Sequence, residues 1–308
     1  MRRLSREDAF FDWGPATMKI LVAGASGYGN LGDDAYRRVF AAQLSEHELM
    51  FDSPYPDGRA VDWCDYLVIG GGGLIYDDAS SHFEYMSCYL DRAIAQGKRF
   101  SFLSCGVQPQ EPDYLPADEE VAGQLRRWAP YLRSAELITV RSERCRRIVA
   151  RLAPEANVHY AADLVYLLEP ASYHLTLPSA VVVVPTRETP QTSQWTEIRG
   201  EIRRQAGPRY VVAMSRDDYA AVETLAEELG GRFGDLVRWN LSPEEACRVI
   251  ADAAHVYTGR YHGRVMAYAQ GVPHTVIFPS YKNRQETPPH RPEDALRTIS
   301  LWRSIARA

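Results

Sequence analysis

An arginine and a histidine stand at a strand-to-helix turn in the segment Thr258–Pro273. The apolar run 253–257 before it is typical of a buried strand, and the apolar spacing of Val265–Ala269 after it is typical of a helix. Arg260 and His262 are therefore predicted to lie at the carboxyl end of a strand, which is where open α/β sheets bind ligands.

These residue types suit a small, strongly anionic ligand. The guanidinium of Arg260 is a planar set of donors for a carboxylate or a phosphate, and the helix start adds free backbone N–H groups with a partial positive charge. The imidazole of His262 can give or take a proton near neutral pH. The alternative is purely structural, with Arg260 bound to a carboxylate of the protein and His262 packed in the turn.

Two more arginines follow predicted strands. Arg141 comes after the strand 137–140 and just before a helix that starts at Ser142, and Arg187 ends the strand 180–187. Together with the arginine of the first turn they favour an anion clamp, because several guanidinium groups offset the charge of a multiply charged ligand. Structural ion pairs would explain the same pattern.

A glycine-rich turn follows the first predicted strand, in the segment 26–34. Its glycines let the backbone approach a ligand closely, but Asp33 and Asp34 would repel a pyrophosphate, so the segment is not a dinucleotide fingerprint. Gly29, Asn30 and the two aspartates are therefore predicted to contact a ligand rich in hydroxyl groups. Capping of the next helix by an aspartate is the structural alternative.

Four consecutive glycines, Gly70–Gly73, end the strand predicted at 64–69. Such a run is costly in conformational entropy, so it is expected where side chains must be absent for a ligand or a second domain to come close. Gly72 and Gly73 are predicted to border the ligand, and Asp77 just beyond is a candidate to hold or deprotonate a hydroxyl. The alternative for Asp77 is an ordinary solvated loop residue.

Composition narrows the class of protein. The chain has 308 residues, 45% of them hydrophobic, and a net charge of −5, so it is an ordinary globular protein without a basic field for nucleic acid. Its five scattered cysteines lack CxxC spacing, which argues against a disulfide framework or a zinc cluster. No apolar run has the length of a transmembrane segment, and residues 1–17 lack the core of a signal peptide, so we expect a cytoplasmic protein. A homo-oligomer is left open.

Strands and helices alternate throughout both halves, which predicts parallel sheets with helices on both faces. We expect an N-terminal extension at 1–17, a Rossmann-like domain at 18–170, a second one at 178–290 and a terminal helix at 291–308. The segment 281–284 is expected to be a polar loop. Two Rossmann-like domains that face each other across a cleft form a GT-B-like α/β fold.

Several motifs resemble those of the polysaccharide pyruvyltransferase family and occur in the family's order. They are spread over residues 18–280 and comprise Gly27–Asp34, Val68–Leu74 with Asp77, Thr139–Ser142, Gly259–Gly263 and Ala269–Pro273. Members of this family resemble GT-B enzymes, but they transfer the pyruvyl group of phosphoenolpyruvate onto two hydroxyls of a sugar, which forms a cyclic ketal and releases phosphate. The resemblance implies a saccharide acceptor at the first domain and the donor at the second.

The resemblance also implies that Arg141, Arg260 and His262 line the donor site, with Arg187 as a further candidate. His262 is expected to act as the general acid–base group or to hydrogen-bond the phosphate, and the arginines to bind carboxylate and phosphate. Tyr261 stands where the family commonly has leucine or another apolar residue, which leaves a small change in pocket shape open.

Asp33 and Asp77 are expected to orient or deprotonate the acceptor hydroxyls. No metal-ligand spacing appears, so neither a metal nor a cofactor is expected besides phosphoenolpyruvate as co-substrate. Three alternatives stay open: a glycosyltransferase whose nucleotide-sugar ribose binds Asp217 or Asp218, a non-catalytic binding protein, and a related transferase with a non-polysaccharide acceptor.

Overall fold

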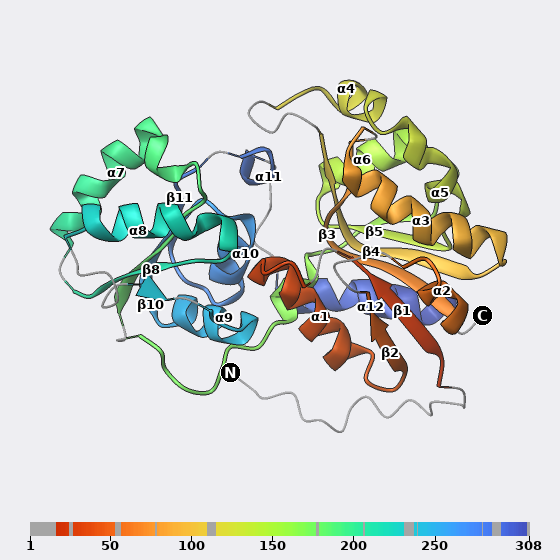
Figure 1. Cartoon of the computed structure of the whole chain (residues 1–308), viewed down its shortest axis with the longest axis horizontal. Helices are drawn as coiled ribbons and strands as arrows, with labels where there is room; N and C mark the ends of the chain where they lie inside the picture. Colours follow the sequence, from red (N-terminus) through yellow and green to blue (C-terminus); the bar gives the residue numbers. More distant parts are fainter. Residues whose placement is uncertain are drawn as a thin grey trace.

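The computed structural model shows two α/β halves, with the N-terminal half on the right of Figure 1 and the C-terminal half on the left. The predicted extension 1–17 lies outside the described residues except for Thr17. The structure describes residues 17–24, 27–52, 57–77, 79–109, 115–176, 179–205, 207–230, 237–238, 240–278, 280–284 and 291–306.

Six parallel strands form the sheet of the N-terminal half, in the order β2-β1-β3-β4-β5-β6. In β1, Ile20 and Val22 belong to one hydrophobic cluster, whereas Leu21 and Ala23 belong to another. Because all four are buried, both faces of the sheet must be covered by helices. The strands are β1 (Lys19–Ala23), β2 (Glu48–Phe51), β3 (Tyr66–Tyr76), β4 (Arg99–Gln108), β5 (Leu137–Val140) and β6 (Val158–Tyr160).

Helices α1 (Leu31–Gln43) and α12 (Pro292–Ala306) contribute to the first of these clusters, and the remaining helices of this half to the second. Those helices are α2 (Ala60–Trp63), α3 (Ser81–Ala95), α4 (Asp118–Gly123), η1 (Arg126–Trp128), α5 (Ala129–Ser134) and α6 (Glu143–Leu152). A short turn of 3-10 helix, η2 (Leu164–Leu167), follows the last strand.

The C-terminal half has a five-stranded parallel sheet in the order β11-β10-β7-β8-β9. Its strands are β7 (Ala180–Val184), β8 (Arg209–Val212), β9 (Val237–Arg238), β10 (Ala253–Thr258) and β11 (His274–Val276). Its helices are η3 (Thr189–Gln191), α7 (Ser193–Arg204), η4 (Arg216–Asp218), α8 (Tyr219–Glu228), α9 (Pro243–Ala251), α10 (Tyr261–Ala269) and α11 (Tyr281–Arg284). The predicted parallel sheets are thus confirmed in both halves.

The terminal helix α12 returns to the N-terminal half (Figure 1). Trp302 packs edge-on against Tyr66 of β3, with ring centroids 5.6 Å apart. The guanidinium of Arg99 donates to the backbone carbonyls of Ile305 and Ala306 at the end of the helix. The last segment of the chain therefore ties the C-terminal half back to the first sheet.

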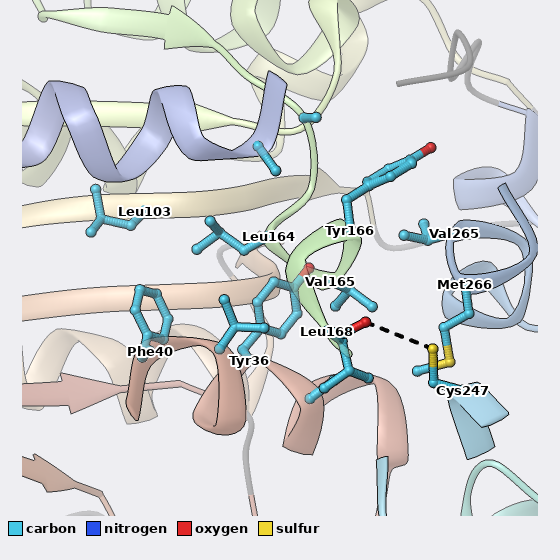
Figure 2. Close-up of a cluster of buried hydrophobic side chains, with 14 of the residues drawn as sticks. Tyr36, Phe40, Leu103, Leu164, Val165, Tyr166, Leu168, Cys247, Val265 and Met266 are labelled. Carbon is cyan, nitrogen blue, oxygen red and sulfur yellow. Dashed lines mark hydrogen bonds between the residues drawn. The ribbon is translucent and has the colours of Figure 1, made fainter. Parts of the chain in front are cut away.

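The turn η2 lies where the two halves meet. Figure 2 shows it between α1, which carries Tyr36 and Phe40, and α10, which carries Val265 and Met266. All four side chains belong to one hydrophobic cluster that includes residues of both sheets. Because this core is continuous, the carboxyl ends of the two sheets are held in a fixed relation.

The prediction that a strand ends at residue 69 is wrong, because β3 continues through the glycine run to Tyr76. A Cβ on Gly70 would lie 2.7 Å from the Phe40 ring, and a Cβ on Gly71 would lie 2.1 Å from the Tyr36 ring. The glycines therefore make room for α1 as well as for the edge of the sheet.

Two further regions form short helices. The segment 118–134 contains α4, η1 and α5, with Pro130 in the first turn of α5, where proline is tolerated. The loop predicted at 281–284 is the short helix α11.

Candidate functional site

A cavity of about 180 Å³ lies between the two halves, at the carboxyl ends of both sheets. This is the edge at which open α/β sheets bind ligands. Its lining comes from five segments beyond strand ends and from the start of α1: Asn30, Asp33, Gln108, Thr186, Glu188, Met214, Gly259, Arg260, Tyr261, His262, Phe278, Ser280, Tyr281 and Lys282.

Arg260 lines this cavity, but its side chain is also bound to the protein. It donates to both carboxylate oxygens of Asp218, from Nε at 2.8 Å and from Nη2 at 2.5 Å. Asp218 is fully buried, whereas the Arg260 side chain keeps a quarter of its surface exposed. The structural alternative for Arg260 is therefore realised, while its position still places a guanidinium at the wall of the cavity.

His262 lies in the first turn of α10 and is 8% exposed. Burial lowers the pKa of His262 well below its usual range, and the charges of Arg141, Lys282 and Arg260 add to this effect. The imidazole is therefore neutral at pH 7. Its ring meets Tyr36 edge-on, with centroids 5.5 Å apart.

Gly32, in the first turn of α1, allows this histidine to approach. A Cβ at Gly32 would lie 1.9 Å from Nδ1 of His262. A real Cβ cannot come that close, so the contact between α1 and α10 requires glycine here. The glycine-rich turn thus serves the site by admitting a side chain from the other half.

Arg141 is buried one layer behind the cavity lining. Its guanidinium carbon lies 4.3 Å from the centre of the Tyr261 ring, and its Nη1 donates to the hydroxyl of Tyr36 at 3.2 Å and to Asp163 at 3.4 Å. A Cβ on Gly106 would lie 2.6 Å from its Nε. Arg141 therefore supplies a fixed positive charge behind Tyr261 and His262.

Lys282 is the cavity cation that the sequence interpretation missed. It lies on α11, and a Cβ on Gly73 would lie 3.2 Å from its Nζ. Burial lowers the pKa of Lys282 to about 8, with Arg141 adding to this effect and Asp33 opposing it. In the described part of the chain, no carboxylate forms an ion pair with it, so its charge is available to a ligand.

Asp33 faces this lysine across the same cavity. A Cβ on Gly72 would lie 2.9 Å from Oδ1 of Asp33. Burial raises the pKa of Asp33 to about 6, although Lys282 and Arg141 act in the opposite direction. Its carboxyl group can therefore give or take a proton near neutral pH.

Asn30 lines the cavity and caps α1, because its side chain accepts from the N–H of Gly32 at 3.1 Å. The expected cap, an aspartate, is therefore replaced by Asn30. Asp34 instead accepts from the N–H of Gly27. Gly29 contacts the second half, since its carbonyl accepts from the N–H of Arg216 at 3.3 Å.

Seven predicted site residues are not part of the cavity lining, namely Gly29, Asp34, Gly72, Gly73, Asp77, Arg141 and Arg187, and the last of these and Asp77 are bound elsewhere. The Arg187 side chain is 70% exposed and pairs with the neighbouring Glu188, because β7 ends three residues earlier, at Val184. Asp77 is buried, and its Oδ1 accepts from the N–H of Ala79 in the turn before α3. Neither is among the cavity residues.

Besides Lys282, the sequence interpretation missed Gln108, Glu188 and Tyr36. Gln108 is the last residue of β4, and Lys282 lies on the short helix that follows β11, so the rule that ligands bind at strand ends could have found both. Tyr36 lies inside a helix, where its apolar ring marks it as a core residue.

The described residues contain no group of three or more His, Cys, Asp or Glu side chains arranged to hold a metal ion. Among these same residues, none of the helices has the length and apolar composition needed to cross a lipid bilayer.

The architecture is that of GT-B-like enzymes. Among solved structures, UDP-GlcNAc 2-epimerase from Methanocaldococcus jannaschii is similar at 8% identity over 93% of this chain and 99% of that one, with a TM-score of 0.57. The Rickettsia bellii enzyme is similar at 8% identity over 95% and 89%, with a TM-score of 0.54. The Neisseria meningitidis enzyme bound to UDP-GlcNAc is similar at 9% identity over 94% and 92%, with a TM-score of 0.50. At such identities these similarities show the fold alone, and they confirm the predicted fold class.

The chain belongs to the polysaccharide pyruvyl transferase family, whose family model matches residues 30–280. The predicted family resemblance is therefore confirmed. No curated protein matches the chain.

Proposed function

We propose that this chain transfers the pyruvyl group of phosphoenolpyruvate onto two hydroxyls of a sugar in a glycan or glycolipid intermediate. The product is a cyclic ketal, and phosphate is released. Family membership supports a pyruvyl transferase. The observation that carries the donor assignment is the meeting of Lys282, His262 and Asp33 in one cavity beside Arg260.

The donor carries a carboxylate and a phosphate close together, so it needs concentrated positive charge. Lys282 provides a cation without an ion-pair partner among the described residues, and Arg260 provides one that Asp218 partly offsets. Arg141 adds a buried charge behind Tyr261. We place the phosphate and the carboxylate of the donor between Lys282 and Arg260.

The reaction balances without a redox partner. The methylene carbon of the donor gains a proton and becomes a methyl group, two bonds form between its C2 and the acceptor oxygens, and the bond from C2 to the phosphate oxygen breaks. Two hydroxyl protons leave the acceptor: one matches the proton gained by carbon and the other departs with the phosphate. His262 delivers the proton to carbon, and Asp33 accepts a hydroxyl proton.

The acceptor approaches from the N-terminal half. Asn30 and Asp33 offer an amide and a carboxyl group at the start of α1, and the backbone at Gly72 and Gly73 leaves space beside them. These groups match the donors and acceptors of sugar hydroxyls. We propose that Asp77 and Asp34 act only through the backbone turns that they hold.

The nucleotide-sugar alternative has less support. Asp218, one of its two candidate ribose ligands, is buried and bound to Arg260, and Asp217 is not among the cavity residues. The cytoplasmic location, the independence from metals and the oligomeric state stay predictions.

The test is phosphate release from phosphoenolpyruvate in the presence of a panel of hexosamine- and galactose-containing glycans. Lys282→Met and His262→Ala should abolish acceptor-dependent release, whereas Arg187→Ala, which changes an exposed residue outside the cavity, should leave it unchanged. Turnover of a nucleotide sugar with no release from phosphoenolpyruvate would contradict the proposal.

A further inference from the structure

The hydroxyl of Tyr36 joins three groups of the site that come from distant parts of the chain. It donates to Oδ2 of Asp163 at 2.7 Å, accepts from Nη1 of Arg141 at 3.2 Å and lies 3.3 Å from Nε2 of His262. Tyr36 and Asp163 are 1% exposed. Neither residue lines the cavity, so both act on the substrate only through the groups that they hold.

The hydrogen of this hydroxyl can serve one acceptor. The carboxylate of Asp163 is the shortest and the charged partner, and its other oxygen is occupied by the N–H of Val165 at 2.9 Å. The guanidinium of Arg141 can only donate. The contact between the hydroxyl oxygen and Nε2 of His262 is therefore a hydrogen bond only if Nε2 carries a proton.

We infer that Tyr36 is a positioning residue that holds neutral His262 in the Nε2–H tautomer, so that Nδ1 is the nitrogen that exchanges a proton with the substrate. The exchange with substrate rests on the proposed function, whereas the tautomer does not. The ring nitrogen left without a proton would be Nδ1, which lies beside Gly32 in the first turn of α1.

The surroundings of Nδ1 agree with this role. A Cβ at Gly32 would lie 1.9 Å from Nδ1, so the imidazole itself occupies the space that any other side chain at this position would fill. Asp33 is the next residue and lines the cavity. Nδ1 therefore lies beside the start of α1, next to a residue of the cavity wall.

Burial, and after it the charges around His262, keep the imidazole neutral before the donor binds. Arg260 directly precedes the helix of His262, Arg141 directly follows β5 and Lys282 lies on α11, and all three disfavour the imidazolium. Asp163 lies 3.9 Å from Nε2 and would favour it. The hydroxyl of Tyr36 donates to that carboxylate and contacts the imidazole. Asp33, Tyr261, Glu188 and Tyr281 are further ionisable groups around the cavity.

The direct test is nitrogen-15 NMR of the full chain labelled at histidine, at pH 7 and without substrate. The chain has eight histidines, and the signals of His262 are those lost in His262→Gln. We expect a pyrrole-type Nε2 and a pyridine-type Nδ1 in the wild type, and a mixture of tautomers in Tyr36→Phe. A protonated Nδ1 in the wild type, or unchanged signals in Tyr36→Phe, would overturn the inference.

A kinetic test separates positioning from a loss of stability. Tyr66→Phe is the matched control, because Tyr66 is also buried and its hydroxyl also donates to a carboxylate, that of Glu136 at 2.9 Å, far from the cavity. Tyr36→Phe should lower kcat by about tenfold or more with little change in KM for phosphoenolpyruvate. It should also move the pH profile of kcat to higher pH, because Asp163 then acts on His262 directly.

If the two variants gave the same kcat and the same pH profile, Tyr36 would be a structural residue only. Because the NMR measurement needs no turnover, a failure of the proposed reaction and a failure of the tautomer assignment are read separately.

Discussion

Arg260 and Asp218 form a two-point ion pair, with Nε and Nη2 of the guanidinium donating to the two oxygens of a fully buried carboxylate. The pair fixes the arginine at the wall of the cavity. It also means that Arg260 has a structural role besides any role toward the ligand, so the loss of activity in an Arg260 variant has two explanations. A Lys282 variant distinguishes the two explanations, because Lys282 forms no ion pair with a described carboxylate and so has no comparable structural role.

Arg260→Ala should lower the free energy of unfolding by about 3 kcal/mol, because Asp218 would be left buried without its partner. Lys282→Met should instead raise the free energy of unfolding by about 1 kcal/mol at pH 7, because it removes a half-buried ammonium that forms no ion pair with a carboxylate of the described residues. In the folded state the pKa of Lys282 is lowered to about 8. The free-energy cost of its charge is therefore complete below pH 8 and disappears as the pH rises toward the pKa of the unfolded state.

Urea unfolding at pH 7 measures both changes, and isothermal titration with phosphoenolpyruvate measures the donor affinity. Lys282→Met should lose at least about tenfold in affinity in spite of its greater stability. Donor binding that is unaffected by Lys282→Met would show that the cation does not hold the donor.

Asp33→Asn should stabilise the protein in a pH-dependent manner. Burial raises the folded pKa of Asp33 to about 6, so ionisation is unfavourable for the folded state. The free-energy cost of ionising Asp33 in the folded protein is absent below the pKa that Asp33 has in the unfolded state. It grows as the pH rises and is complete above pH 6. We expect Asp33→Asn to raise the free energy of unfolding by about 1 kcal/mol at pH 8 and to leave it unchanged at pH 3.5. The gain is smaller than the full pKa shift would give, because the carboxyl group is partly exposed. Thermal unfolding of both proteins across this range is the measurement, and an equal gain at both pH values would contradict the raised pKa.

Donor binding should take up protons from the buffer. Burial, and after it the charges of Arg141, Lys282 and Arg260, lower the pKa of His262. An anionic donor would offset those charges and so raise the pKa of His262. Titration calorimetry at pH 7 in buffers of different ionisation enthalpy measures the uptake. His262→Ala should remove most of it, and proton release on binding would contradict the proposed electrostatics.

Replacement of glycine by alanine should abolish activity at one helical position and stabilise the protein at another. Gly32→Ala would place a Cβ 1.9 Å from Nδ1 of His262, so it should abolish activity although alanine favours helices. Gly200→Ala lies inside α7, with its nearest neighbour at 3.5 Å, and should raise the free energy of unfolding by up to about 1 kcal/mol with unchanged activity. Phosphate release measures the activity of both variants, and urea unfolding measures their stability. An active Gly32→Ala would show that His262 is not held against α1 during turnover.

The fold could be predicted because its signals are local. Apolar runs such as 253–257, the capping box from Ser242 to Glu245 and the strand-to-helix turn at Arg260 each fix an element within a few residues. The regular alternation of these elements then leaves parallel sheets as the outcome. For the same reason His262, Arg260 and Asp33 could be identified as site candidates, since each follows a strand.

The rest depends on contacts between distant segments. The extension of β3 across Gly70–Gly73 is set by the packing of Tyr36, and the ion pair of Arg260 with Asp218 joins two different strand ends. Lys282 is placed by the closeness of the two halves. No periodic pattern in the sequence reports such distances, so the partners of a predicted site residue emerge only from the folded chain.

The most direct test of the central claim is to incubate the protein with phosphoenolpyruvate and the glycan panel, measuring phosphate release and the mass of the glycan together. The account predicts that one acceptor gains the mass of a ketal-linked pyruvyl group in step with phosphate release, and that Lys282→Met and His262→Ala show neither change. Acceptor modification from a nucleotide sugar, with phosphoenolpyruvate left intact, would contradict it.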